Sequence, residues 1–222
     1  MSEAHPSRTV SSAQDSIHPR LDAVVARHLQ QPWQQPLHTP TVAAFERLQH
    51  YLVDFSPRLV LDSGCGTGES TRLLAAQCPE CTVIGVDKST ARLSLTGMEA
   101  FPAHHDNAIW LRADLATFWR LALQAGWKLE RHYLLYPNPW PKAGQLRRRW
   151  HGHPVFPALL ALGGLLEMRC NWSIYAEEFA RAASLAGAGN QGVQAVPDDS
   201  DLSPFERKYR NSGHALYRVV AK

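Results

Sequence analysis

The sequence predicts an α/β fold: a doubly wound, mostly parallel sheet with helices on both faces. The first reason is an alternation of short apolar segments, which suit buried strands, with longer segments of helical spacing. The second is a glycine-rich turn, Gly64-Cys65-Gly66-Thr67-Gly68, between the first strand and a helix. The third is a series of aspartates at successive strand ends. Parallel strands end at one edge of a sheet, so these groups should meet there.

The first 40 residues are expected to form a polar, partly disordered N-terminal extension. Residues 1–18 are rich in Ser and His, and the segment from Gln30 to Pro40 contains three prolines and four glutamines. Between these two stretches, apolar residues from Leu21 to Leu29 have helical spacing. The main domain is therefore expected at residues 41–222.

Within the main domain, helices and strands are expected to alternate. Helices are expected at 41–55, 69–77, 89–96, 115–124, 156–162 and 172–185. Strands are expected at 58–62, 82–87, 108–112, 132–136 and 165–169, with weaker ones at 193–196 and 215–220, the last antiparallel. Strands that alternate with helices indicate a mostly parallel sheet covered on both faces.

The composition is that of a soluble globular protein. Apolar residues make up 45% and charged residues 19%, and no run of about 18 apolar residues predicts a membrane span. The N-terminus lacks an apolar signal core, and four cysteines are too few for a disulfide framework, so we expect a reducing, cytoplasmic compartment. Cys78 and Cys81 have metal-like spacing without a second pair, which favours a turn at a helix end and no metal site.

The glycine turn and three aspartates predict a pocket for a nucleoside that carries an amino acid. The glycines let the backbone turn sharply and approach a ligand closely. Asp87 ends the second strand and could accept both hydroxyl protons of a ribose, Asp114 suits an adenine edge, and Asp62 could receive an ammonium group. The glycine spacing is tighter than the dinucleotide form, so S-adenosylmethionine fits better than NAD. The expected cofactor-binding residues are Asp62, Gly64, Gly66, Gly68, Asp87, Asp114 and Asn138.

A proline-rich loop, Tyr136-Pro137-Asn138-Pro139-Trp140-Pro141-Lys142, leads into a basic segment. No Asp or Glu occurs between Arg131 and Leu166, whereas Lys142, Arg147, Arg148 and Arg149 do. A concentrated basic block suits a phosphate backbone, although a solvated basic loop is the plain alternative. The adjoining Pro-Trp-Pro favours RNA binding.

These motifs together resemble the bacterial tRNA (guanine-N7)-methyltransferases, a family of class I S-adenosylmethionine-dependent methyltransferases. The counterparts are Asp62 to Gly66, Gly85 to Asp87, Tyr136 to Lys142, Cys170 to Ala176 and Ser203 to Glu206. Their order and approximate spacing hold over about residues 58–220. The resemblance implies a Rossmann-like methyltransferase fold, S-adenosylmethionine as cofactor and tRNA as partner. The substrate-binding residues that we expect are Lys142, Arg147, Arg148, Arg149, Asn171, Ser203, Phe205 and Glu206.

Two residues depart from the family pattern at the expected reaction centre. Asn138 stands where the family loop has Asp, and Asn171 stands where a Thr-Asp-Trp segment has Asp. Guanine N7 has a lone pair and no proton, so its methylation needs positioning rather than a general base. Its product is cationic, however, so a nearby carboxylate should favour the transition state. We therefore expect these two asparagines to be catalytic and to set the rate or the base preference.

Two other functions stay open. Asn138-Pro139-Trp140 also resembles, imperfectly, the Asn/Asp-Pro-Pro-aromatic loop of enzymes that methylate amino groups. A divergent methyltransferase acting on an amino nitrogen of another substrate is one alternative. A non-catalytic relative that binds RNA through its basic segment is the other.

Overall fold

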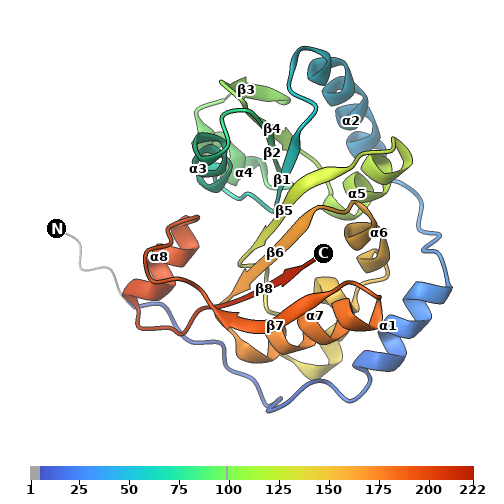
Figure 1. Ribbon diagram of the computed structural model, residues 1–222, viewed down its shortest axis with the longest axis vertical. Helices are drawn as coiled ribbons and strands as arrows, with labels where there is room; N and C mark the ends of the chain where they lie inside the picture. Colours follow the sequence, from blue (N-terminus) through green and yellow to red (C-terminus); the bar gives the residue numbers. More distant parts are fainter. Residues whose placement is uncertain (1–5, 99) are drawn as a thin grey trace.

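The computed structural model describes residues 6–98 and 100–222, which contain one eight-stranded sheet flanked by helices (Figure 1). The strands are β1 (Leu59–Ser63), β2 (Thr82–Asp87), β3 (Ala103–His105), β4 (Ala108–Arg112), β5 (Leu129–Leu135), β6 (Leu165–Cys170), β7 (Asn190–Ala195) and β8 (Tyr217–Ala221). The α-helices are α1 (Leu21–Gln30), α2 (Thr39–Tyr51), α3 (Glu69–Gln77), α4 (Thr90–Leu93), α5 (Leu115–Gln124), α6 (Phe156–Ala161), α7 (Ser173–Leu185) and α8 (Pro204–Asn211). Short 3₁₀-helices are η1 (Leu52–Asp54), η2 (Ser94–Thr96), η3 (Ala143–Arg148) and η4 (Trp150–Gly152).

The strand order β3-β4-β2-β1-β5-β6-β8-β7 confirms the predicted doubly wound sheet. Strands β4, β2, β1, β5 and β6 pair in parallel, whereas β3, β8 and β7 pair antiparallel. From β1 the chain moves outward to β2 and β4, then returns to β5 on the other side. The carboxyl ends of β1 and β5 therefore flank the point where the winding reverses, which is where open α/β sheets bind ligands.

The N-terminal extension packs on the main domain. Leu21 and Val25 of α1 are buried, and α1 lies against α7 with an ion pair between Asp22 and Arg181. The side chain of Ser12 also donates to the carbonyl oxygen of Pro141 in the proline-rich loop, at 2.6 Å. Residues 1–5, which belong to the segment predicted to be disordered, lie outside the described residues. The boundary at residue 40 stays a prediction.

The strand β3 and the helix α8 were missing from the sequence prediction, as were the short 3₁₀-helices η3 and η4. Strand β3 is a three-residue edge strand without a periodic pattern, and α8 is a polar helix placed in a segment without apolar spacing. A signal for α8 was present, because Ser203 and Glu206 have the spacing of a helix N-cap. In the structure the Ser203 hydroxyl accepts a hydrogen bond from the Glu206 backbone N–H.

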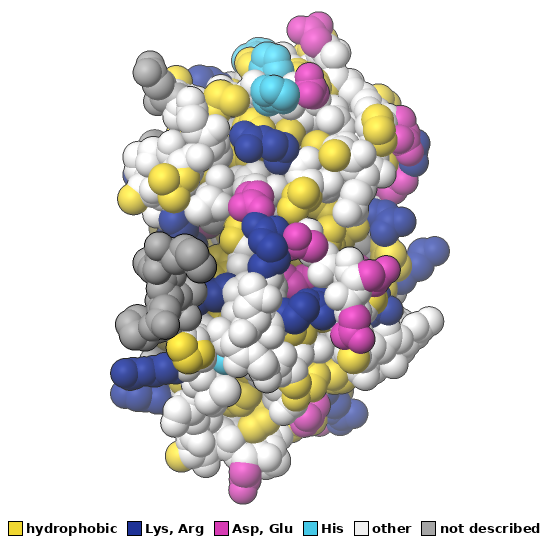
Figure 2. All heavy atoms as spheres, turned by 90° about the vertical axis from the view of Figure 1, so that its left-hand side faces the viewer, with side chains coloured by type: hydrophobic (Ala, Val, Ile, Leu, Met, Phe, Trp, Pro, Cys, Tyr) yellow, Lys and Arg dark blue, Asp and Glu magenta, His cyan; other side chains and the backbone are white. Residues whose placement is uncertain are grey.

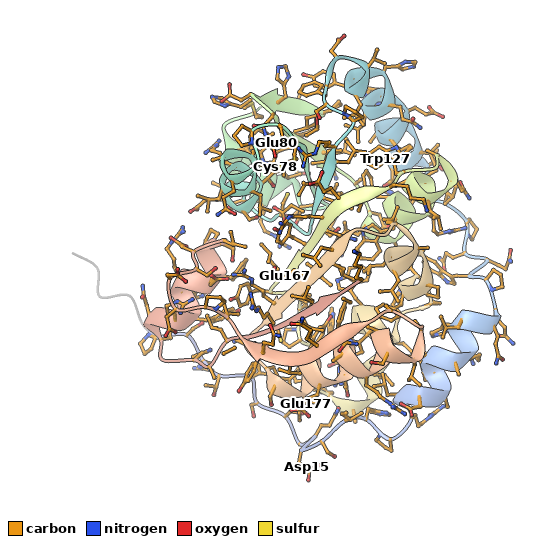
Figure 3. All side chains as sticks on the ribbon, viewed as in Figure 1. Asp15, Cys78, Glu80, Trp127, Glu167 and Glu177 are labelled. Atoms are coloured by element: carbon orange, nitrogen blue, oxygen red, sulfur yellow. A yellow bond between two sulfur atoms is a disulfide. The ribbon has the colours of Figure 1, made fainter. Side chains whose placement is uncertain are left out.

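The turn predicted after α3 is present and contains a disulfide. Cys78 and Cys81 are bonded to each other, and Figure 3 labels Cys78 and Glu80 at this corner of the fold. This disulfide was not expected, because disulfides are rare in the reducing compartment that the sequence suggests. No helix in the described part of the chain has the length and hydropathy needed to cross a membrane.

Candidate active site

A cavity of about 1310 Å³ opens at the carboxyl ends of β1, β2, β4 and β5. Its wall combines the glycine turn, the loop after β5, the first turn of α5, parts of α2 and α8, and residues 33–38 of the N-terminal extension. Pockets for one small ligand typically measure ~300–1,000 Å³, so this cavity has room for a cofactor and part of a second ligand. The predicted site residues in its wall are Gly64, Asp87, Asp114, Asn138, Arg147, Arg148 and Phe205.

The glycine turn has the backbone conformation that the sequence predicted. Gly64, Gly66 and Gly68 all have positive φ, at 81°, 59° and 78°. An added Cβ on Gly64 would have only Leu115 Cδ1 within 4 Å, at 3.9 Å, so this part of the turn is open for a close ligand approach. At Gly68 a Cβ would lie 2.4 Å from Trp110 Nε1, so that glycine is required for packing.

Asp87 and Asp114 both lie in the cavity wall. Asp87 Oδ1 accepts from the Ser89 backbone N–H at 2.8 Å, and its Oδ2 accepts from that of Gly66 at 3.1 Å. A carboxylate has about four acceptor positions, so both oxygens can still accept a hydroxyl proton. Asp114 Oδ1 accepts from the Thr117 backbone N–H at 2.9 Å and caps α5. The two carboxylate acceptors and the open glycine turn therefore fit a nucleoside carrying an amino acid.

Asp62 does not belong to the described cavity wall. It is fully buried behind the glycine turn, where its Oδ2 accepts hydrogen bonds from the Ser70 and Thr71 hydroxyls at 2.6 and 2.8 Å. Its Oδ1 has no hydrogen-bond partner among the described residues. Burial raises the pKa of Asp62 to about 6, although the two hydroxyls oppose this shift. This placement indicates a role in holding α3 against β1 and does not support the predicted ammonium contact.

The proline-rich loop places Asn138 in the cavity wall with its side chain exposed. Tyr136 and Trp140 on either side have positive φ, at 50° and 47°, a conformation that costs non-glycine residues about 1–3 kcal/mol. Several contacts hold this conformation. The Tyr136 hydroxyl donates to Glu206 at 3.0 Å, and the Trp140 carbonyl oxygen accepts from Arg149 Nε at 3.1 Å. The loop is therefore held at both ends.

The basic segment divides into exposed and buried parts. Arg147 and Arg148 are exposed in the cavity wall, and the Arg148 guanidinium lies 4.8 Å from the ring centroid of Trp140. Lys142 is exposed but is not part of the wall. Arg149 is completely buried and forms an ion pair with Glu178. The prediction that Arg149 contacts RNA is wrong, because packing against α7 directs this side chain inward.

Two histidines, His151 and His153, follow the basic segment directly and do not add positive charge to it. His151 is buried and contacts Glu178, and its pKa is lowered, chiefly by burial. His153 lies in the cavity wall beside Trp33 and Trp150, and burial lowers its pKa to about 4. The His153 ring is therefore neutral near pH 7 and contributes shape and apolar contact to the wall. His151 contacts Glu178 inside the protein and is not part of the described wall.

Asn171, Ser203 and Glu206 lie outside the described cavity wall. Asn171 Nδ2 contacts His214 Nδ1 at 3.1 Å, so the structure does not place its side chain against a base in the cavity. Ser203 caps α8. Glu206 is buried and accepts from Arg169 at 2.9 Å, and Arg169 also pairs with Glu167 of β6, labelled in Figure 3. Ser203 and Glu206 therefore anchor α8.

Helix α8 presents Phe205 and Tyr209 to the cavity. Phe205 is 40% exposed, and its ring stacks at 6.1 Å from that of Tyr209, which in turn stacks on His214 at 5.3 Å. Arg207 of α8 pairs with Glu69 at the start of α3. Figure 2 shows basic and acidic side chains intermixed on this face of the molecule. Tyr209 was missed in the sequence, although its spacing of four from Phe205 places both on one helix face.

Comparisons with known proteins identify the family. A family model described as "Putative methyltransferase" matches residues 56–219. The tRNA (guanine-N(7)-)-methyltransferase of Acidithiobacillus ferrooxidans is 31% identical over 169 residues, which cover 72% of this chain and 73% of the relative. The protein of the same name from Shewanella amazonensis is 30% identical over 170 residues, covering 72% and 71%.

Solved structures show the same fold. The 16S rRNA methyltransferase KamB has a TM-score of 0.56 at 17% identity, over 84% of this chain and 94% of that one. The antibiotic-resistance methyltransferase Kmr has a TM-score of 0.54 at 22% identity, over 79% and 90%. At these identities the match concerns architecture alone. The family model and the curated relatives go further: this chain is a divergent member of the tRNA (guanine-N7)-methyltransferase family, whose enzymes use S-adenosylmethionine.

Proposed function

We propose that this protein transfers the methyl group of S-adenosylmethionine to N7 of a guanine in tRNA. The observation that carries the proposal is the cavity at the reversal of the sheet, whose wall joins the glycine turn and Asp87 to Asn138 and Phe205. The relatives named tRNA (guanine-N(7)-)-methyltransferase support the same reaction. We also propose that residues 41–222 form the catalytic domain, residues 1–40 its extension, and the cytoplasm its compartment.

The cofactor end of the site is assigned to three groups. S-adenosylmethionine supplies an electrophilic methyl group on a positively charged sulfur. Gly64 lets the backbone approach the amino-acid part, Asp87 accepts hydroxyl protons of the ribose, and Asp114 lies where it can meet the adenine edge. These contacts fix the direction in which the methyl group faces the proline-rich loop.

The acceptor end is assigned to Asn138 and Phe205. Guanine N7 attacks with its own lone pair, so the site must align N7 with the methyl group and exclude water, without removing a proton. The exposed ring of Phe205 offers a stacking surface for a base. The Asn138 amide offers one acceptor and two donor hydrogens to the base edge. An asparagine at this position is thus compatible with N7 transfer, although its neutral amide stabilises the cationic product less than a carboxylate would.

Two tRNA transcripts test the proposal, one with guanine and one with 7-deazaguanine throughout. The second has a carbon in place of N7 and keeps the Watson–Crick edge and the exocyclic amino group. With radiolabelled S-adenosylmethionine, we expect label in the first transcript and none in the second, at equal binding. Label in both transcripts would indicate transfer to an amino nitrogen. Binding without label in either would indicate the non-catalytic alternative.

A further inference from the structure

A second group of basic side chains borders the cavity, on the side away from the proline-rich loop. Arg47 comes from α2, Lys88 follows β2, and Arg112 ends β4. All three side chains are exposed and line the cavity. Lys88 and Arg112 are neighbours, because Asp87 pairs with Arg112 across the sheet and Arg112 Nε lies 3.4 Å from the Lys88 carbonyl oxygen. We call Arg47, Lys88 and Arg112 the cofactor-side cluster.

The acidic groups that the structure describes do not neutralise this cluster. Among the described residues, no carboxylate lies within 4.0 Å of the charged nitrogens of Arg47, Lys88 or Arg112. Arg92 nearby differs, because its Nη1 lies 3.5 Å from Asp87 Oδ2. The acidic residues in the described cavity wall are Asp87 and Asp114, and both already accept backbone N–H groups. Three exposed positive charges thus remain available to a ligand.

The cofactor does not account for these charges. S-adenosylmethionine carries a sulfonium and an ammonium group against one carboxylate, so it is positively charged overall. Its carboxylate belongs to the amino-acid end, which we assign to the glycine turn. The cluster instead surrounds Asp87 and Asp114, where the ribose and adenine are neutral. The three cations therefore do not attract the positively charged cofactor, whereas they do attract an anionic partner.

We propose that Arg47, Lys88 and Arg112 bind the phosphate backbone of the RNA on the cofactor side of the cavity. This inference rests on the proposed function. Lys142, Arg147 and Arg148 would hold the backbone on the side of the proline-rich loop. Phosphate contacts set the register of a nucleic acid without reading its bases. Contacts on both sides hold the target nucleotide over the cavity, into which an extruded base can enter.

The test uses the full chain with Arg47→Ala, Lys88→Ala and Arg112→Ala combined. A matched control combines Lys128→Ala, Arg131→Ala and Lys222→Ala. These substitutions also remove three positive charges, but at the end of the sheet where the parallel strands begin. These control side chains are exposed, lie near the start of β5 or the end of β8, and do not line the described cavity. A second version with glutamine at the three cluster positions keeps more of each side chain if the alanine variant folds poorly.

The readout is the slope of log Kd for unmodified tRNA against log salt concentration. Each lost phosphate contact should reduce the slope by about 0.7–0.9, so we expect a reduction of roughly 2 for the cluster variant and a much smaller one for the control. The affinity for S-adenosylmethionine, measured by calorimetry, should not fall. Equal slopes for cluster and control variants would overturn the proposal. So would a weaker cofactor affinity with an unchanged slope, which would assign the cluster to the cofactor.

The wild-type protein separates this outcome from failure of the proposed function. If the wild type methylates tRNA while the two triple variants have equal slopes, only the cofactor-side cluster is wrongly assigned. If the wild type neither binds nor methylates tRNA, the proposed function fails and this inference fails with it.

Discussion

Arg149 and Glu178 form a completely buried ion pair, with 2.5 Å between Nη1 and Oε2. The same arginine donates from Nε to the carbonyl oxygen of Trp140 at 3.1 Å. Glu178 lies on α7 and also accepts from the Gln14 side chain and the His18 backbone. The pair therefore connects α7 and the N-terminal extension to the loop that carries Asn138. Burial raises the pKa of Glu178, but His151 and Arg149 outweigh this and lower it to about 2.

Glu178→Gln should destabilise the protein strongly, because it leaves the Arg149 charge buried without its counterion. Loss of one partner of such a pair typically costs about 3–5 kcal/mol. Urea unfolding followed by circular dichroism measures the change. The double variant Arg149→Met, Glu178→Leu should lose less stability than the single variant. Its methyl transfer should nevertheless be slower than that of the wild type, because the Trp140 carbonyl oxygen loses the hydrogen bond from Arg149. A single variant that unfolds like wild type would show that the pair contributes no stability.

Asp62 predicts a dependence of stability on pH. Its folded pKa of about 6 lies above the ordinary value of 3.8, so the folded state holds the proton more tightly and stability falls as pH rises from about 4 to 6. Asp62→Asn removes this loss, so at pH 8 its free energy of unfolding should exceed that of the wild type by up to about 3 kcal/mol. At pH 4 the difference should be small. Thermal unfolding at the two pH values measures both.

The same variant tests the placement of Asp62 behind the glycine turn. Calorimetry should give an affinity for S-adenosylmethionine within about threefold of wild type, which is less than the ~1–3 kcal/mol expected for loss of a charge-assisted bond. A tenfold weaker affinity would instead restore Asp62 as the acceptor of the ammonium group.

Asp87→Ala should weaken cofactor binding. The substitution removes the carboxylate that lies in the cavity wall and bonds to Gly66 and Ser89, so the affinity for S-adenosylmethionine should fall by ~1–3 kcal/mol. Asp198→Ala is a suitable control, because its side chain is exposed and lies outside this cavity. Equal affinities for Asp87→Ala and wild type would remove Asp87 from the binding site.

Asn138→Asp should raise the single-turnover rate with tRNA. A carboxylate in the cavity wall places negative charge near the base as its ring becomes cationic, and roughly tenfold corresponds to about 1.4 kcal/mol of transition-state stabilisation. Asn171→Asp is the matched comparison. Its position outside the described wall predicts a change of less than about twofold. A larger effect of Asn171→Asp would show that this residue reaches the base after all, while a slower Asn138→Asp would indicate an amino-group acceptor.

The features that the sequence predicted correctly depend on local pattern. The glycine turn and Asp87 follow from strand-turn-helix spacing over a few residues, and parallel pairing then brings strand ends together. The errors concern burial, which distant segments decide. Arg148 and Arg149 belong to the same run of three arginines, but Arg149 is buried because it forms an ion pair with a glutamate 29 residues later. Asn171 follows a strand as expected, but His214 holds its side chain. Arg47 was overlooked because only tertiary packing brings α2 beside β4.

Nucleoside analysis of the reaction product identifies the atom that receives the methyl group. Purified protein, S-adenosylmethionine and a tRNA transcript are incubated, the RNA is digested to nucleosides, and the products are separated by mass spectrometry. We expect 7-methylguanosine, at a much lower yield with Asp87→Ala when the cofactor is limiting. A methylated adenosine or cytidine, or a guanosine methylated on its amino group, would contradict the assignment of N7 as acceptor. No methylated nucleoside at all, from protein that binds both tRNA and the cofactor, would contradict catalysis.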